Sequence, residues 1–210
     1  MFPASNGMEH KPICIFVMGR PGAGKDTQAA LLSDFFHLEN IKTSGLLRAV
    51  FEATPADPVI AHQKEMFDAG ELNDPEWVMG IVLKRVEQLC ENNFEGKNGV
   101  IFSGSPRTLY EAERFVPFLV ERFGKDRIVG VLVSVSEEEG LERILKRNAR
   151  PLDRDEAILR TRMQEFNERT EPAIDYLRQR GALVTIDGMP APEVVFEQAK
   201  DAIAGRFGLS

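Results

Sequence analysis

A glycine-rich turn between an apolar run and a helical stretch limits the fold of this chain more than any other feature. Residues 13–18 are all apolar, and residues 19–28 follow with the sequence Gly-Arg-Pro-Gly-Ala-Gly-Lys-Asp-Thr-Gln. Residues 26–36 then carry apolar side chains at the spacing of a helix. A buried strand, a glycine loop and a helix in this order predict a phosphate-binding loop, because glycines let backbone N–H groups and the helix N-terminus face one anion.

Two side chains of this loop have roles that follow from phosphate chemistry. Lys25 supplies a positive charge for the terminal phosphates of a nucleotide, and a hydroxyl just after it is a ligand for Mg²⁺. The strict pattern has Ser or Thr directly after the lysine, whereas here Asp26 stands in that place and Thr27 supplies the hydroxyl. We therefore expect Thr27 to bind Mg²⁺ together with phosphates and water.

The rest of the chain alternates between short apolar runs and long amphipathic stretches. Further apolar runs occupy residues 100–102, 128–135 and 182–186, with helical stretches such as 77–89 and 111–123 between them. This alternation predicts a parallel sheet covered by helices on both faces. Two segments, 43–74 and 148–154, fit the alternation poorly, and inserts on a rigid core of this kind are candidates for moving parts.

Charge and composition narrow the class of protein. The formal net charge of -7 argues against a general nucleic-acid-binding protein, since such proteins are usually basic. No apolar stretch is long enough to span a bilayer, and residues 1–12 lack the apolar core of a signal peptide. Cys14 and Cys90 lack metal-ligand spacing, which fits a reducing compartment. We expect a cytoplasmic protein that binds neither nucleic acid nor membranes.

Positive charge is nevertheless concentrated in one part of the chain. Residues 143–162 contain seven cationic side chains: Arg143, Lys146, Arg147, Arg150, Arg154, Arg160 and Arg162. Arg162 falls inside the apolar stripe of a predicted helix, where a charge needs either a buried carboxylate or a bound phosphate as its partner. Arg143 and Arg147 share one helix face, which is either solvated or directed at a phosphate.

The glycine loop, with its threonine two places after the lysine, resembles that of adenylate kinases and related nucleoside monophosphate kinases. Other motifs of that family follow in order over nearly the whole chain. Residues 41–48 (Ile-Lys-Thr-Ser-Gly-Leu-Leu-Arg) resemble the segment that holds the monophosphate, and residues 68–74 (Asp-Ala-Gly-Glu-Leu-Asn-Asp) are similar to the loop beside its base. Residues 104–108 (Gly-Ser-Pro-Arg-Thr) resemble the family's Gly-Phe-Pro-Arg-Thr, and residues 141–147 resemble the helix before its lid.

The resemblance implies a fold and a reaction. The fold is a P-loop NTPase three-layer α/β/α domain over residues 1–210, with a five-stranded parallel sheet, a helical monophosphate-binding insert near 42–74 and a short lid near 148–155. The reaction is reversible, Mg²⁺-dependent phosphoryl transfer from ATP to AMP, which gives two ADP. The protein is expected to be a monomer. The same chemistry with GMP or a pyrimidine monophosphate is one alternative, and a weakly catalytic nucleotide-binding regulatory protein is another. No cysteine lies between Arg147 and Arg162, so no structural zinc is expected.

The resemblance also implies which residues form the site. The cations that stabilise charge during transfer are Lys25, Arg107, Arg147, Arg150 and Arg162, with Arg154 as a competitor for the lid position of Arg150. ATP is expected to contact Pro21, Gly22, Ala23, Gly24, Lys25, Asp26, Thr27, Arg143, Arg147 and Met189. The monophosphate is expected to contact Thr43, Arg48, Glu71, Leu72, Asn73, Gly104, Ser105, Pro106, Arg107, Glu111, Arg150 and Arg162.

Three residues depart from the family's pattern. Asp26 replaces a glycine and Ser103 replaces an aspartate that organises the waters of Mg²⁺, so we hypothesise that the carboxylate of Asp26 compensates for Ser103. Glu111 stands where the family has a glutamine that reads adenine. A carboxylate only accepts hydrogen bonds, which suits the two donors of guanine better than adenine. The sequence therefore leaves both AMP and GMP as possible acceptors. The alternative to a base-reading role is that Glu111 is a glutamate on the helix surface that touches no base.

Overall fold

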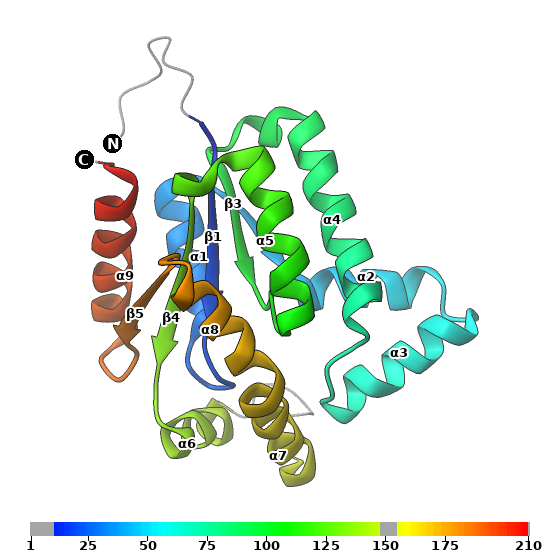
Figure 1. Ribbon diagram of the computed structural model, residues 1–210. Coiled ribbons are helices and arrows are strands. Elements are labelled where there is room, and N and C mark those ends of the chain that lie inside the picture. Colours follow the sequence, from blue (N-terminus) through cyan, green and yellow to red (C-terminus); the bar gives the residue numbers. More distant parts are fainter. Residues whose placement is uncertain (1–10, 148–154, 210) are drawn as a thin grey trace.

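Five parallel strands form the centre of the molecule (Figure 1). The computed structural model describes residues 11–147 and 155–209. Its strands lie in the order β2-β3-β1-β4-β5 and every neighbouring pair is parallel. They comprise β1 (Ile13–Met18), β2 (Glu39–Lys42), β3 (Gly99–Ser103), β4 (Ile128–Ser134) and β5 (Leu183–Asp187). The predicted α/β fold with a five-stranded parallel sheet is confirmed.

Four of the strands coincide with the apolar runs of the sequence, and β2 does not. The sequence of β2 is Glu-Asn-Ile-Lys, and of these four residues only Ile41 is buried. β2 is one of the two edge strands and pairs only with β3 within the described sheet. A strand with only one buried apolar side chain shows no run of apolar residues by which its hydrophobicity could identify it.

Helices cover both faces of the sheet (Figure 1). One face carries α1 (Lys25–Phe36) and α9 (Pro192–Phe207), and the other carries α4 (Pro75–Glu91), α5 (Leu109–Phe123) and α8 (Glu171–Gln179). The remaining helical elements are α2 (Thr43–Ala53), α3 (Pro58–Ala69), η1 (Asn93–Gly96), η2 (Lys125–Arg127), α6 (Glu137–Arg147), α7 (Glu156–Glu165) and a π-helical turn, η4 (Phe166–Thr170). The stretches at 77–89 and 111–123 are helical as predicted.

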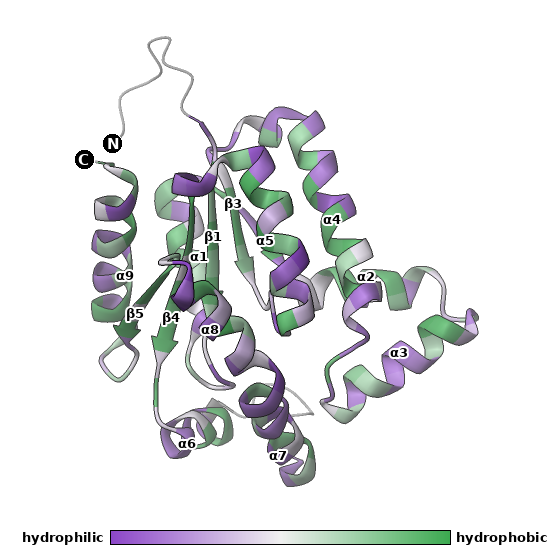
Figure 2. Cartoon of the chain, in the orientation of Figure 1, coloured by the Kyte–Doolittle hydropathy of each residue, from purple (hydrophilic) through white to green (hydrophobic). Residues whose placement is uncertain are grey.

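Strand β1 is buried on both faces, which explains its uninterrupted apolar sequence. Cys14, Phe16 and Met18 belong to the cluster under α4, α5 and α8, whereas Ile13 and Ile15 belong to the cluster under α1 and α9. Side chains of a strand point alternately to opposite faces, so a continuous apolar run is the signature of a strand with helices on both sides. Figure 2 shows the same arrangement, with hydrophobic strands between helices whose outer faces are hydrophilic.

The fold brings the loops that follow the strands to one edge of the sheet. The carboxyl ends of β1 and β3 lead into the loops at Gly19 and Gly104, and neighbouring parallel strands end at the same edge. Helices α2 and α3 project from this edge to one side, and α6 and α7 lie below it in Figure 1. This edge is where open α/β sheets bind their ligands. Within the described residues, no helix is both long and apolar enough to cross a membrane.

Replacement of Phe102 by alanine tests the core. Its ring is fully buried and lies 4.9 Å from that of Phe115 and 5.5 Å from that of Phe16, centroid to centroid. We expect Phe102→Ala to lower the free energy of unfolding by about 3–5 kcal/mol, because the cavity cannot close in a packed core. Urea denaturation measures it. Val59→Ala, at a side chain that is 60% exposed, should change stability by less than about 0.5 kcal/mol, and similar losses in both variants would contradict the assignment of the core.

Candidate active site

The loop after β1 has the backbone that close contact with an anion requires. Gly22 and Gly24 both adopt φ of 84°, a conformation that side chains disfavour, and Gly24 is the N-cap of α1. Among the described residues, no side-chain hydrogen bond caps the start of α1. The N–H groups at the start of a helix lack intrahelical partners and attract negative charge. Lys25 and Asp26 follow directly after this turn as the first residues of α1.

The same loop is in close contact with α6 through two glycines. A Cβ atom on Gly22 would lie 2.0 Å from the carbonyl oxygen of Gly140, and one on Gly140 would lie 2.6 Å from the carbonyl oxygen of Pro21. Neither position can take a side chain unless the backbones separate. Helix α6 therefore rests directly on the phosphate loop. The sequence analysis missed Gly140, because nothing local marks a glycine whose neighbour lies so far away in the chain.

Arg143 connects α6 with the loop after β5. Its Nε donates to Glu139 Oε1 at 2.6 Å, Nη1 to the Gly188 carbonyl at 2.8 Å, and Nη2 to the Met189 carbonyl at 3.1 Å. Arg143 therefore does not point to open solvent. These contacts close one side of a pocket of about 280 Å³, the loop pocket, which is lined by Gly22, Ala23, Gly24, Thr27, Gln28, Arg143, Gly188, Pro190, Pro192 and Val195. The side chain of Met189 is 49% exposed and does not line this pocket.

A larger pocket opens on the other side of Lys25. This large pocket measures about 720 Å³, within the size range of small-molecule sites. It brings together most residues predicted to contact the monophosphate, and it is lined by Lys25, Asp26, Thr43, Ser44, Leu47, Arg48, Phe67, Asp68, Gly70, Glu71, Leu72, Asn73, Val78, Ser103, Gly104, Arg107, Glu111 and Arg162.

A third, narrow pocket joins the phosphate loop to the large pocket. Ser105 and Pro106 line it, together with Pro21, Lys25, Gly70, Leu72, Arg107, Arg162, Glu165, Phe166 and Thr170 among others. Lys25, Arg107 and Arg162 line both the narrow and the large pocket. Three cations from different parts of the chain therefore surround one region beside the phosphate loop, which suits two phosphate groups held next to each other.

The side chains of Arg48 and Arg162 are each positioned by a neighbouring residue of the large pocket. The guanidinium of Arg48 lies 5.0 Å from the centre of the Phe67 ring, a cation–π distance. Arg162 packs against the backbone of Gly70, since a Cβ atom there would lie 3.1 Å from Arg162 Cγ. The predicted inward position of Arg162 is therefore a position in the wall of the pocket. Phe67 was not singled out from the sequence.

Asn73 holds the walls of the pocket together. It is buried, and its Nδ2 donates to the carbonyl of Gln63 at 2.6 Å and to Gln63 Oε1 at 3.0 Å. The same Oε1 accepts from the backbone N–H of Asp74 at 3.0 Å, next to the start of α4. The amide donor of Asn73 is thus committed to fixing α3 against α4.

Glu111 belongs to a helix cap. Its Oε2 accepts from the backbone N–H of Arg107 at 2.9 Å and its Oε1 from Thr108 Oγ1 at 3.4 Å, while its own N–H donates to Thr108 Oγ1 at 3.1 Å. Thr-x-x-Glu at the start of α5 is the sequence pattern of a capping box, which could have predicted this arrangement, although Glu111 here accepts from the N–H of Arg107, one residue before the N-cap. The alternative of a surface glutamate is wrong, because Glu111 is only 2% exposed. Burial raises its pKa, although the hydrogen bond from Arg107 and the nearby cations act against that rise.

Asp26 and Ser103, the two departures at the expected magnesium site, are direct partners. Ser103 Oγ donates a short hydrogen bond to Asp26 Oδ1 across the space between β3 and α1. The carboxylate of Asp26 is therefore held at the end of β3, where the resemblance implies an aspartate. In the part of the chain that the structure describes, no three His, Cys, Asp or Glu side chains gather as a metal site. Arg147 is the last residue of α6. Arg150, Arg154 and residues 148–154 of the lid expected near 148–155, where no zinc ligands are expected, lie outside the described residues.

The parallel sheet, the glycine loop at the end of β1 and the cations around one phosphate position define a P-loop phosphotransferase. Comparison with known proteins specifies the family. A family model described as Adenylate kinase matches residues 17–182. Adenylate kinase of Synechococcus sp. (strain JA-2-3B'a(2-13)) is 34% identical over 197 residues, which cover 92% of this chain and 97% of that protein. Adenylate kinase of Thermus thermophilus is 33% identical over 194 residues, which cover 90% of this chain and 96% of that protein. The chain belongs to the adenylate kinase family.

The contact between the two glycines predicts a specific loss of ATP binding. In Gly140→Ala the new methyl group must push the phosphate loop away, so we expect the Kd for ATP to rise by about tenfold or more. Titration calorimetry measures the Kd. Gly80→Ala is the matched control, because Gly80 is also inside a helix and a Cβ atom there meets nothing within 4 Å. Equal ATP affinity in the two variants would contradict the role of this contact.

Proposed function

We propose that this protein is a nucleoside monophosphate kinase that transfers a phosphoryl group reversibly from ATP to AMP and so forms two ADP. The observation that supports this most is the position of Lys25, Arg107 and Arg162, which line both the narrow and the large pocket beside the phosphate loop. ATP would lie along the phosphate loop with its base toward the loop pocket. AMP would occupy the large pocket, with its phosphate directed at the same three cations.

The reaction follows from this arrangement. An oxygen of the AMP phosphate attacks the γ-phosphorus of ATP, and the bond from that phosphorus to the bridging oxygen of ADP breaks. Negative charge shifts to the bridging oxygen, and Lys25, Arg107 and Arg162 stabilise it from fixed positions without a covalent intermediate. Arg147 and Arg150 complete the proposed set of cations.

The residues near Thr27 fit a magnesium ion. Mg²⁺ prefers oxygen ligands and keeps several of its waters. Asp26, whose carboxylate accepts a hydrogen bond from Ser103, and Thr27 are consecutive residues in the first turn of α1, so both supply oxygen atoms at the start of that helix. When bound to the donor nucleotide, Mg²⁺ neutralises phosphate charge. Thr27 would bind it, and Asp26 would hold its waters.

Adenine is the acceptor base that we propose. Both oxygens of Glu111 already accept hydrogen bonds from Arg107 and Thr108, so the carboxylate is engaged in capping α5. A guanine would have to compete with those donors. The relatives from Synechococcus and Thermus thermophilus are named adenylate kinases, which agrees with this choice.

We also propose which segments of the protein move, its oligomeric state and the compartment in which it works. Residues 42–74 would close over AMP and residues 148–155 over ATP, which excludes water from the transferred group. We also propose that the protein acts as a monomer, as the resemblance to the family implies. Cys14 and Cys90 are free thiols, which fits the reducing cytoplasm.

The acceptor and the part played by Glu111 can be tested together. Purified protein is given MgATP with AMP, GMP, CMP, UMP or dTMP, and ADP formation is followed. We expect AMP to react fastest, and Glu111→Gln to change the ratio of AMP to GMP rates by less than about threefold, because a glutamine oxygen can still accept from Arg107. A tenfold shift toward AMP in Glu111→Gln would instead identify Glu111 as a base reader. ATP binding without turnover of any acceptor would favour a regulatory nucleotide-binding protein.

The role of Asp26 can be tested by magnesium titration. We expect Asp26→Asn to raise the Mg²⁺ concentration for half-maximal rate several-fold, because the charge that orders the metal's waters is lost. Adding Ser103→Asp to this variant should restore the value by returning a carboxylate to the same place. Asp34→Asn, at an exposed aspartate of the same helix, is the control. An unchanged magnesium dependence in Asp26→Asn would rule out the compensation.

A further inference from the structure

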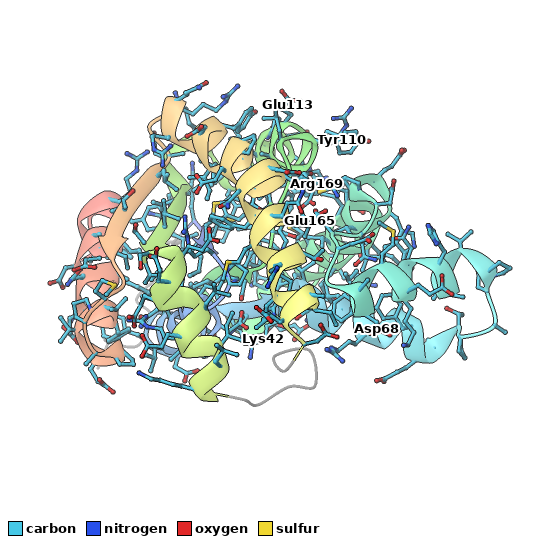
Figure 3. The ribbon with its side chains drawn as sticks, turned by 90° about the horizontal axis from the view of Figure 1, so that it is seen from below. Lys42, Asp68, Tyr110, Glu113, Glu165 and Arg169 are labelled. Carbon is cyan, nitrogen blue, oxygen red and sulfur yellow. The ribbon has the colours of Figure 1, made fainter. Side chains whose placement is uncertain are left out.

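Arg169 lies behind the acceptor side of the site and belongs to none of the motifs in the sequence. It is part of η4, the π-helical turn between α7 and α8, and π-helical turns occur frequently at functional sites. Its Nη1 donates to Glu165 Oε2 at 3.2 Å and lies 3.5 Å from the carbonyl oxygen of Leu72. In Figure 3, Glu165 and Arg169 follow each other along one helix, on the side where Tyr110 of α5 is labelled.

The residues that Arg169 contacts line the narrow pocket, and one of them also lines the proposed acceptor site. Leu72 lines both the narrow and the large pocket, and Glu165 lines the narrow one. The loop that carries Leu72 also rests on α7, because a Cβ atom on Gly70 would lie 2.8 Å from Ile158 Cγ2. Arg169 thus adds a polar contact at the end of the same loop, and the two contacts fix the loop against α7 and η4.

Arg169 also contributes positive charge near the start of α5, which forms another wall of the site. The buried carboxylate of Glu111 accepts hydrogen bonds from the N–H of Arg107 and the hydroxyl of Thr108, and the charges of Arg107 and, from η4, Arg169 act on it. Both cations favour the ionised carboxylate against the effect of burial. In the proposed reaction the guanidinium of Arg107 binds phosphate. Of these two cations, Arg169 is then the one that lies outside the phosphate-binding position.

We propose that Arg169 is a positioning residue for the acceptor nucleotide: it holds the loop at Leu72 and balances the carboxylates of Glu165, on the narrow pocket, and Glu111, on the large pocket. The inference rests on the proposed function, since it takes that pocket as the AMP site. Without the guanidinium, the loop loses a contact and an incoming phosphate dianion meets two carboxylates that lack this cation. Binding should weaken at the acceptor side only, because the contacts described for Arg169 involve no residue that lines the loop pocket.

The test compares Arg169→Met with Arg160→Met. Arg160 lies on α7 and pairs with Glu156 at 2.7 Å with the same i, i+4 spacing, but both side chains point into solvent. We expect Arg169→Met to raise the KM for AMP by about fivefold, the usual scale for one hydrogen bond, and to change the KM for MgATP by less than about twofold. Arg169→Lys should recover part of the loss, and Arg160→Met should behave as the wild type. Equal changes in both KM values, or the same effect in Arg160→Met, would overturn the inference.

Binding of AMP alone separates this inference from the proposed function. Titration calorimetry should give a Kd for AMP about fivefold higher in Arg169→Met than in the wild type, with thermal unfolding of the free proteins recorded alongside. If the wild type binds AMP more tightly than the variant yet never transfers a phosphoryl group, the proposed function fails and the role of Arg169 stands. If the two proteins bind AMP equally, or the wild type does not bind AMP, the inference is overturned whatever the turnover.

Discussion

The structure depends on bringing phosphate-binding groups together in a chain whose formal net charge is -7. Two nucleotides repel each other through their phosphates, so the cations and N–H groups that face them must converge at one place. The parallel sheet provides that place, because β1 and β3 end side by side and deliver the phosphate loop and Arg107 to the same edge. Arg162 approaches from α7 and lines the same two pockets. The other features of the site serve to hold these groups still.

Close backbone contacts provide much of that rigidity. Gly140 lets α6 rest on the phosphate loop, and Gly70 lets the acceptor loop rest on α7. Helix α6, which precedes the expected lid segment, is thus attached to the proposed ATP site. Helix α7, which follows that segment, is attached to the proposed AMP site. A shift of α6 relative to α7 would move the donor and acceptor sites relative to each other. The hydrogen bonds of Arg143 to Gly188 and Met189 extend the first attachment to the loop after β5, and Arg169 extends the second to Leu72.

Much of this organisation could be predicted from the sequence, and the exceptions share a cause. The phosphate loop, the strands β1, β3, β4 and β5 and the cations near the phosphates all have local patterns that chemistry explains. Strand β2 was missed because only Ile41 of its four residues is buried. Gly140, Phe67 and Arg169 were missed because their roles arise from neighbours distant in the chain. Glu111 is different, because its capping box with Thr108 is a local pattern that the sequence contains and that explains its burial without any contact to a base.

The central claim is that one chain holds ATP and AMP at once, with their phosphates meeting at Lys25, Arg107 and Arg162. The most direct test is calorimetric titration with a ligand of two adenosines joined by five phosphates, which spans both sites. Because the second half binds intramolecularly, the account predicts one ligand per chain and an affinity at least about a hundredfold above that of ATP or AMP alone. An affinity no better than that of ATP, or two such ligands per chain, would contradict it.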